Sequence, residues 1–228
     1  RLCRAAGAAA PKGLTIAARA ASSLAFASVA LIRSIDTGTL VIGNLGFKKA
    51  ATTSSDQSAN TAVTWLQARI SDATLHADIL TSGQAYYATS IDALDPSGNS
   101  RPVTGSPARP FVNWAGDSCG NCLSSGYCSA CYNPSAAVTT ADGYTHRYLI
   151  TRMCLCAGDP NGTCAGTSLS NSCSSPMTSS AGESPKKGEL KYGDNVRFSG
   201  SGSPFYRVIV RTEGPRNTAT VTETYVHF

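Results

Sequence analysis

The residues with the most chemical potential in this chain are cysteines, which lie in two C-x-x-C pairs. One pair is Cys119 and Cys122, the other is Cys128 and Cys131, and five residues separate them. Four thiolates in two such pairs match the ligand set of a tetrahedral zinc site. Zinc ribbons, however, usually separate their two pairs by many more residues. The spacing therefore keeps zinc as an alternative but does not favour it.

The remaining cysteines favour disulfides over a metal. The chain has nine cysteines, and eight lie between residues 119 and 173, in a segment rich in serine and glycine. The four that follow the C-x-x-C pairs are Cys154, Cys156, Cys164 and Cys173. An even number of crowded cysteines is typical of a disulfide framework in an oxidising compartment. We predict that all eight form disulfides, and about 105 pairings remain open.

Neither C-x-x-C pair carries the marks of a haem or redox site. Leu123 and Tyr132 follow the two pairs, where the c-type haem signature requires histidine, and no thioredoxin-like strand-to-helix pattern surrounds them. The histidines, His76, His146 and His227, are isolated in sequence; the last two lie in predicted strands, where we expect half-exposed surface positions. No nucleophile elbow, zinc-protease motif or P-loop occurs. We therefore predict that the protein is not an enzyme and uses no cofactor.

The composition points away from the cytosol and from nucleic acid. Among 228 residues, charged side chains make up only 14%, and the formal net charge is +5. Small and hydroxyl-bearing residues dominate instead, which is typical of a turn-rich β protein outside the cytoplasm. The longest basic runs are Lys48-Lys49 and Lys186-Lys187. Because the positive charge is scattered, we expect no nucleic-acid partner.

The elements that must position these residues begin with a long helix over residues 23–70. Its first part, Ser23–Ile32, is apolar and carries no charge. Its last part places apolar residues three and four positions apart, which is the spacing of one buried helical face. These residues are Ala59, Ala62, Val63, Leu66 and Ile70. The first part therefore needs lipid or other helices around it, and the second needs a globular head.

Glycines interrupt the middle of this helix. Gly38, Gly43 and Gly46 fall within nine residues, and each costs a helix about 1 kcal/mol relative to alanine. We expect the segment either to kink or loosen, or to bend or melt when subunits pack together. Just before it, Arg33 and Asp36 are spaced to form an ion pair across one turn.

After the helix, the pattern changes to turns and strands. Tyr144–Met153 is rich in aromatic and β-branched residues, which predicts a strand. Phe205–Thr212 alternates apolar residues with arginine, as a half-buried strand does, and it forms a predicted hairpin with Thr218–Phe228. Tyr86 and Tyr87 are expected to anchor the connection from helix to sheet. The chain is therefore predicted to be α+β, with an antiparallel sheet packing one apolar face against the helix.

Four stretches of the chain resemble PilX-type minor pilins, which are subunits of type IV pili. The first two are ALIRSIDTGTLVIGNLGFKKAA, residues 30–51, and SANTAVTWL, residues 58–66. The other two are YYATSIDALDPSGN, residues 86–99, and SPFYRVIVRTEGPRNTATVTETYV, residues 203–226. The cysteine-rich middle of the chain is not covered well by the resemblance.

The resemblance implies a type IV pilin fold and a structural role. The N-terminal helix would form the filament core, an antiparallel sheet would pack on its second half, and disulfide-rich loops at residues 113–175 would decorate the head. Such a subunit docks through its helix and promotes pilus assembly or display. The implied partners are other pilin subunits, in a filament of one or several kinds, a tip adhesin, and the inner membrane before assembly. The implied location is an extracellular pilus.

The resemblance also assigns roles to residues near the start of the chain. The residues expected to dock among neighbouring pilin helices are Leu24, Phe26, Val29, Leu31, Ile32, Leu40, Ile42, Leu45 and Phe47. Pilin precursors carry a short basic leader that ends in glycine, which predicts cleavage between Gly13 and Leu14. The fifth mature position would then be Ala18 instead of the usual glutamate. This departure puts the usual charge pairing with a neighbour's N-terminal amine in doubt.

Three regions follow from these expectations: a leader or uncertain N-terminal segment at 1–22, the helix at 23–70, and a globular β head at 71–228.

For residues 1–22, two interpretations stay open: a diverged pilin that leans on neighbouring helices, or a start that is not the native one. Two alternative functions also stay open. In the first alternative, the cysteine-rich loops are an adhesive binding module at the pilus tip. In the second, the chain is a self-polymerising filament subunit.

Overall fold

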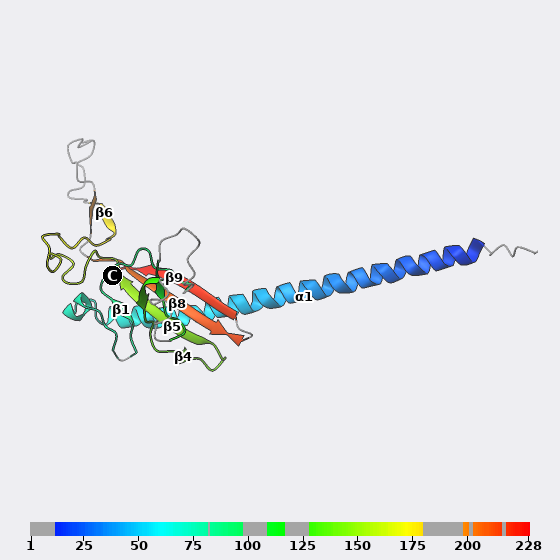
Figure 1. Ribbon diagram of the computed structural model, residues 1–228, viewed down its shortest axis with the longest axis horizontal. Coiled ribbons are helices and arrows are strands. Elements are labelled where there is room, and N and C mark those ends of the chain that lie inside the picture. Colours follow the sequence, from blue (N-terminus) through cyan, green and yellow to red (C-terminus); the bar gives the residue numbers. More distant parts are fainter. Residues whose placement is uncertain are drawn as a thin grey trace, which may run out of the picture. The chain divides into compact units, whose positions relative to one another are not determined.

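The computed structural model describes residues 12–81, 83–97, 109–116, 128–179, 198–200, 203–215 and 218–228. The chain divides into two compact units, residues 1–47 and residues 48–228. Helix α1 runs from Lys12 to Gln67, and the short 3-10 helix η1 follows at Ala73–His76. The strands are β1 (Tyr86–Tyr87), β2 (Arg109–Val112), β3 (Cys128–Tyr132), β4 (Val138–Thr139), β5 (Thr145–Arg152), β6 (Met177–Ser179), β7 (Phe198–Gly200), β8 (Tyr206–Gly214) and β9 (Thr218–Val226) (Figure 1).

Helix α1 differs in detail from the predicted helix. It stays helical through Gly38, Gly43 and Gly46, so the glycines do not interrupt it in the single chain. It begins inside the segment that was expected to hold a leader, and residues 13 and 14 lie within it. It ends at Gln67, so Ile70 falls beyond the helix and is 38% exposed instead of lying on the buried face. The apolar spacing of Ile70 was therefore coincidental.

The main sheet is mixed, which corrects the prediction of an antiparallel sheet. Its strand order is β1-β5-β8-β9, with β4 pairing a further part of β5. The predicted strands are confirmed as β5, β8 and β9, and they pair antiparallel as neighbours (Figure 1). Strand β1, however, runs parallel to β5, with Tyr86 opposite Ile150. A parallel pair requires a long crossover, and residues 88–144 provide it.

The second part of α1 covers one face of this sheet. In the helix, Ala62 and Leu66 are fully buried, as the predicted spacing requires. They pack with side chains of β5 and β8 that point to the same face, because alternate residues of a strand share a face. The buried members of this cluster are Ala62, Leu66, Leu75, Tyr86, Ala88, Tyr148, Ile150, Tyr206, Val208 and Val210. Helix and sheet therefore share one core within the second unit.

The opposite face of the sheet is also buried at β5 and β8, so the prediction that Phe205–Thr212 is a half-buried strand was wrong. Leu149 and Ile209 are fully buried there and pack against Tyr87, Val112 and Trp114. Arg207, which was expected to point to solvent, is only 8% exposed. Its guanidinium forms a two-pronged ion pair with Glu223 across β8 and β9, at 2.9 and 3.0 Å. The segments around β1 and β2 thus form a second layer that the alternation pattern did not reveal.

A line of polar contacts ties α1 to the sheet. Ser55 is fully buried, and its Oγ lies 2.7 Å from Thr222 Oγ1 on β9. Ser54 Oγ lies 3.1 Å from His146 Nε2, and His146 Nδ1 lies 2.9 Å from Thr212 Oγ1. His146 is 4% exposed, so the expectation of a half-exposed surface histidine was wrong. Its ring instead bridges the helix and β8, because both ring nitrogens have a hydroxyl partner.

The segment that precedes β8 begins and ends at one place in the head. Phe205 N–H donates to the carbonyl of Ser174 at 2.8 Å, and Ser174 N–H donates to the carbonyl of Met153. Beyond these contacts, β6 and β7 pair antiparallel, with Met177 opposite Gly200. Strands β6 and β7 therefore form a two-stranded stem, and the described residues next to it, Ser174 and Phe205, lie together at the end of β5.

Candidate functional site

The first candidate site is the apolar segment, which we define as residues 25–47 of α1. Its large apolar side chains are exposed, from 50% at Val29 to 77% at Phe26. The exposed set comprises Phe26, Val29, Leu31, Ile32, Ile35, Leu40, Val41, Ile42 and Leu45. Two other predicted docking residues stand apart: Phe47 is half-buried, and the side chain of Leu24 lies outside the described residues. The chain itself therefore leaves this surface uncovered.

The exposed side chains surround the helix instead of forming one stripe. Successive residues of an α-helix turn by about 100°. Phe26, Leu31 and Ile32 therefore point to three different sides within two turns. A helix that is apolar all round is buried among other helices or in lipid, whereas a one-sided helix lies on a protein surface. The apolar segment has the first pattern.

Few charges interrupt this surface. Arg33 and Asp36 are the charged residues of the apolar segment. The predicted ion pair between them is not formed: the described ion pairs are Arg207–Glu223 and Arg211–Glu213. By length and composition α1 can cross a membrane, with a mean hydropathy of 1.5 over its best 18-residue window and none of that window buried. An apolar helix of this kind near the N-terminus could be a membrane anchor or a signal.

A groove on the apolar segment was missed by sequence reasoning. Small residues at Ala30, Ser34 and Gly38 repeat every four positions, and they line a shallow depression with Arg33 and Val41. Small residues at this spacing let two helices approach closely. A Cβ atom added at Gly38, Gly43 or Gly46 would meet nothing within 4 Å. Nothing in the part of the chain that the structure describes therefore requires these glycines, and the four-residue repeat was the signal that could have found the groove.

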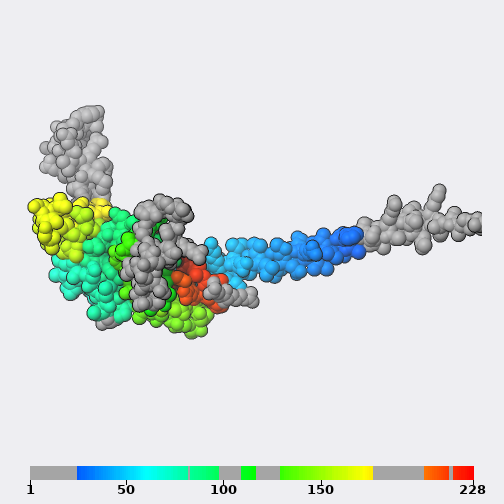
Figure 2. Space-filling model, viewed as in Figure 1, coloured from blue at the N-terminus to red at the C-terminus, as the bar shows by residue number. Residues whose placement is uncertain are grey.

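The second candidate site is the disulfide loop, which we define as residues 153–174. Cys154 pairs with Cys173, and Cys156 pairs with Cys164 inside the larger ring. The yellow residues of this loop form part of the surface of the head (Figure 2). Leu155 and Leu169 are 58% and 61% exposed on it. Two nested cross-links thus hold a short polar loop in one conformation.

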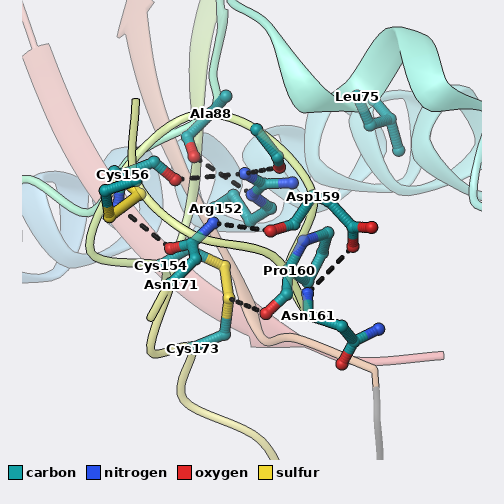
Figure 3. Close-up of a disulfide and its surroundings, with 12 residues drawn as sticks. Leu75, Ala88, Arg152, Cys154, Cys156, Asp159, Pro160, Asn161, Asn171 and Cys173 are labelled. Carbon is teal, nitrogen blue, oxygen red and sulfur yellow. Dashed lines mark hydrogen bonds between the residues drawn. A yellow bond between two sulfur atoms is a disulfide. The ribbon is translucent and has the colours of Figure 1, made fainter. Parts of the chain in front are cut away.

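Arg152 holds the base of the disulfide loop. Its Nε donates to the carbonyl of Ala88 at 3.0 Å, and its Nη2 donates to the carbonyls of Cys156 and Gly158 at 3.3 and 2.8 Å (Figure 3). The side chain of Asn171 crosses the loop between the backbone of Cys156 and that of Asp159. These contacts order the loop from its inner side, where disulfides alone would leave carbonyls unpaired.

The other predicted cysteines are placed only in part. Cys131 is disulfide-bonded and lies in β3. The backbone of Cys128 lies in the same strand, while its side chain, Cys119 and Cys122 lie outside the described residues. Among the described residues, no group of three or more His, Cys, Asp or Glu side chains could hold a metal ion. Because Cys131 is disulfide-bonded, it cannot be one of four zinc-binding thiolates, so the structure does not support the zinc alternative for the two C-x-x-C pairs.

The histidines do not come together in a reactive site. Burial lowers the pKa of His146, which favours its neutral ring between the two hydroxyls. His76 lies in η1 and is half-buried, and exposed His227 packs edge-on against the ring of Phe205. Burial also raises the pKa of Tyr87 to about 12, and the Tyr87 hydroxyl donates to the carbonyl of Asn133 at 3.1 Å. These perturbed groups serve packing within the head.

Comparisons with known proteins do not add a relative to this description. No family model, no curated protein and no solved structure matches the chain. The functional argument therefore depends on three structural features of the chain. These are a helix packed on a mixed sheet, disulfides in the head, and an apolar segment that could be a membrane anchor or signal.

Proposed function

We propose that the protein is a structural subunit of a type IV pilus, of the PilX-type minor pilin kind. The apolar segment would pack among the N-terminal helices of other subunits and so promote pilus assembly or display of the head. The observation that carries the proposal is the set of large apolar side chains on all sides of residues 26–45, which the chain leaves exposed. The protein acts by non-covalent contact and needs no cofactor.

The size of the exposed surface supports this role. Burying one large aliphatic or aromatic side chain is worth about 1.5–3 kcal/mol, so several such side chains drive association strongly. Before assembly the inner membrane would cover them, and in the filament the helices of other pilin subunits would take its place. The groove at Ala30, Ser34 and Gly38 adds close helix approach to this general affinity.

The experiment that tests the proposal places a photoreactive amino acid at Ile42 in cells that make pili. We expect cross-links to the N-terminal helices of pilin-like subunits, or of a second copy, in the fraction sheared from the cell surface. A matched probe at Gln57, which is exposed in the head-packing part of α1, should give none of these products. Cross-links to lipid alone, with no protein in the sheared fraction, would overturn the proposal and leave a membrane-anchored head.

A second function, adhesion by the cysteine-rich loops, has one observation in its favour. Leu155 and Leu169 are exposed on a loop held by two disulfides, and rigid exposed leucines suit a contact surface. Serine at both positions should then leave the number of pili unchanged but remove adhesion to a target surface. Loss of pili in this variant, or unchanged adhesion, would contradict a separate adhesive module.

A further inference from the structure

A cavity in the head lies away from the apolar segment and borders the base of the disulfide loop at Arg152 and Pro160. Its volume is about 290 Å³, and it opens between the residues that follow α1 and the residues that precede β8. This volume suits a small organic molecule, because one water occupies about 30 Å³. Leu75, Pro204 and Phe228 form apolar parts of its wall, and Arg152 and Ser203 contribute polar atoms. The lining of the cavity therefore combines apolar surface with polar atoms.

The polar part of the lining includes a buried positive charge. Arg152 is 1% exposed, and its described partners are three neutral carbonyls. It forms no ion pair with the described residues, and its Nη1 makes no hydrogen bond with them; one guanidinium nitrogen carries no dashed line in Figure 3. A buried charge is costly unless an opposite charge accompanies it. An anion in this cavity would supply that charge.

A second donor at the cavity also lacks a partner. The hydroxyl of Ser203 is buried, and among the described residues it makes no hydrogen bond. An unpaired buried hydroxyl costs about 1–3 kcal/mol. A carboxylate accepts bonds at two oxygens, so it can bind a guanidinium N–H and a hydroxyl together. Ser203 and Arg152 thus match the same ligand group.

Asp72 is the anion that already lies at this cavity. Its side chain is exposed to solvent, and its Oδ1 accepts a hydrogen bond from Thr74 N–H at 3.0 Å. The ion pairs of the described residues do not include one between Asp72 and Arg152. Solvent screens its repulsion of a second anion.

We propose that this cavity binds the carboxylate of a small organic acid that carries an apolar body. The carboxylate contacts Arg152 Nη1 and Ser203 Oγ, and the apolar body packs on Leu75, Pro204 and Phe228. The apolar wall is the reason to prefer an organic acid to an inorganic anion. This inference is independent of the pilus proposal, because no residue of the apolar segment takes part.

The test uses the full-length, isotope-labelled chain in detergent micelles at pH 7. Isobutyrate is the probe, and isobutyramide, which has the same shape without the charge, is its matched control. We expect isobutyrate to shift the amide NMR signals of Leu75, His76 and Ser203 with a dissociation constant in the millimolar range, and isobutyramide to bind at least tenfold more weakly. Equal shifts with both compounds, or no shift at 100 mM isobutyrate, would overturn the proposal.

The variant Ser203→Ala separates binding from folding. Because Ser203 Oγ has no partner among the described residues, its removal should leave the free energy of unfolding unchanged or slightly higher. The affinity for isobutyrate should fall about tenfold, the value of one hydrogen bond to a charged group. Ser170→Ala, at an exposed serine of the disulfide loop, should alter neither quantity. Unchanged isobutyrate affinity in Ser203→Ala would contradict the site.

Discussion

The two parts of helix α1 reverse the usual relation between composition and burial. The apolar segment, residues 25–47, is rich in large apolar side chains, and the chain leaves all of them but Phe47 exposed. Residues 48–67, the head segment, are mostly small and polar, yet Ala51, Ser55, Ala62 and Leu66 are fully buried there. The difference indicates that the head segment packs within its own domain, whereas the apolar segment presents its side chains to surroundings outside the chain.

The largest expected effect tests the burial of the head segment at Leu66, whose side chain is fully buried between helix and sheet. We expect Leu66→Ala to lower the free energy of unfolding of the head by about 2–5 kcal/mol, because it leaves a cavity. Denaturant unfolding of the purified full chain measures this, and membrane association should stay unchanged. Gln67→Ala, at the exposed neighbouring residue, is the control and should cost little. Equal effects of the two variants would show that the head segment is not packed as described.

The reciprocal change is Leu31→Asp in the apolar segment. An aspartate near the centre of an apolar environment costs about 3 kcal/mol, so the variant should be depleted from membranes and from pili. Unfolding of the head should be unaffected, because Leu31 is 63% exposed within the chain. Asn60→Asp, at an exposed position of the head segment, supplies the matched control. A Leu31→Asp protein that fractionates like the wild type would remove the distinction between the two segments.

The disulfides should stabilise the head without affecting the apolar segment. Cys154 and Cys173 are 19 residues apart, and Cys156 and Cys164 are 8 apart. From loop-closure entropy, replacing the first pair by alanine should cost about 3 kcal/mol and replacing the second about 2.5 kcal/mol. Denaturant titration of each double variant without reductant measures the two losses. Reduced membrane association in either variant would be unexpected, because both rings lie in the head.

Glycine should respond oppositely in the two regions. Gly38→Ala has room for its new methyl group and should stabilise the helix by roughly 1 kcal/mol, measurable as slower amide hydrogen exchange around residue 38. Gly143→Ala should destabilise the head, because Gly143 has a φ of 79°, which L side chains rarely adopt. If the glycines of the apolar segment serve assembly, Gly38→Ala should also reduce pilus number. More pili with a more stable helix would argue against that role.

The smallest expected effect concerns pH. Burial lowers the pKa of His146 below its value in the unfolded chain, so the folded state binds the proton less well. The stability that the neutral ring contributes is complete above the unfolded pKa of about 6.5, and it declines as the pH falls below that value. Unfolding free energies at pH 7.5 and 5.5 should show the loss, and it should shrink in His146→Gln. The membrane association of the apolar segment should not follow this pH dependence.

Sequence reasoning found the elements whose signals are periodic. The spacing of Ala62 and Leu66 predicted the buried helix face, and the alternation in β8 and the β-branched run in β5 predicted the central strands. The same reasoning failed at the far side of the sheet, where Ile209 packs on Val112 and Trp114. Val112 and Trp114 come from short segments without periodicity, so no local sequence pattern predicts the second layer around β1 and β2.

Tertiary context also decided what the candidate sites contain. The sequence indicated that cysteines would pair, but the pairing of Cys154 with Cys173 depends on how the loop returns to the end of β5. The burial of His146 depends on Ser54, which lies 92 residues earlier in the chain. The cavity at Arg152 is lined by residues from four separate segments, so the spacing of these residues in the sequence does not predict it.

The stem formed by β6 and β7 has a consequence for labelling the protein with inserted peptides. Because Phe205 and Ser174 are joined by a 2.8 Å hydrogen bond, the intervening stretch starts and finishes at neighbouring points of the head. Lengthening a closed loop raises its entropic cost only with the logarithm of its length. Peptide tags inserted between residues 180 and 197 should thus be tolerated by the sheet.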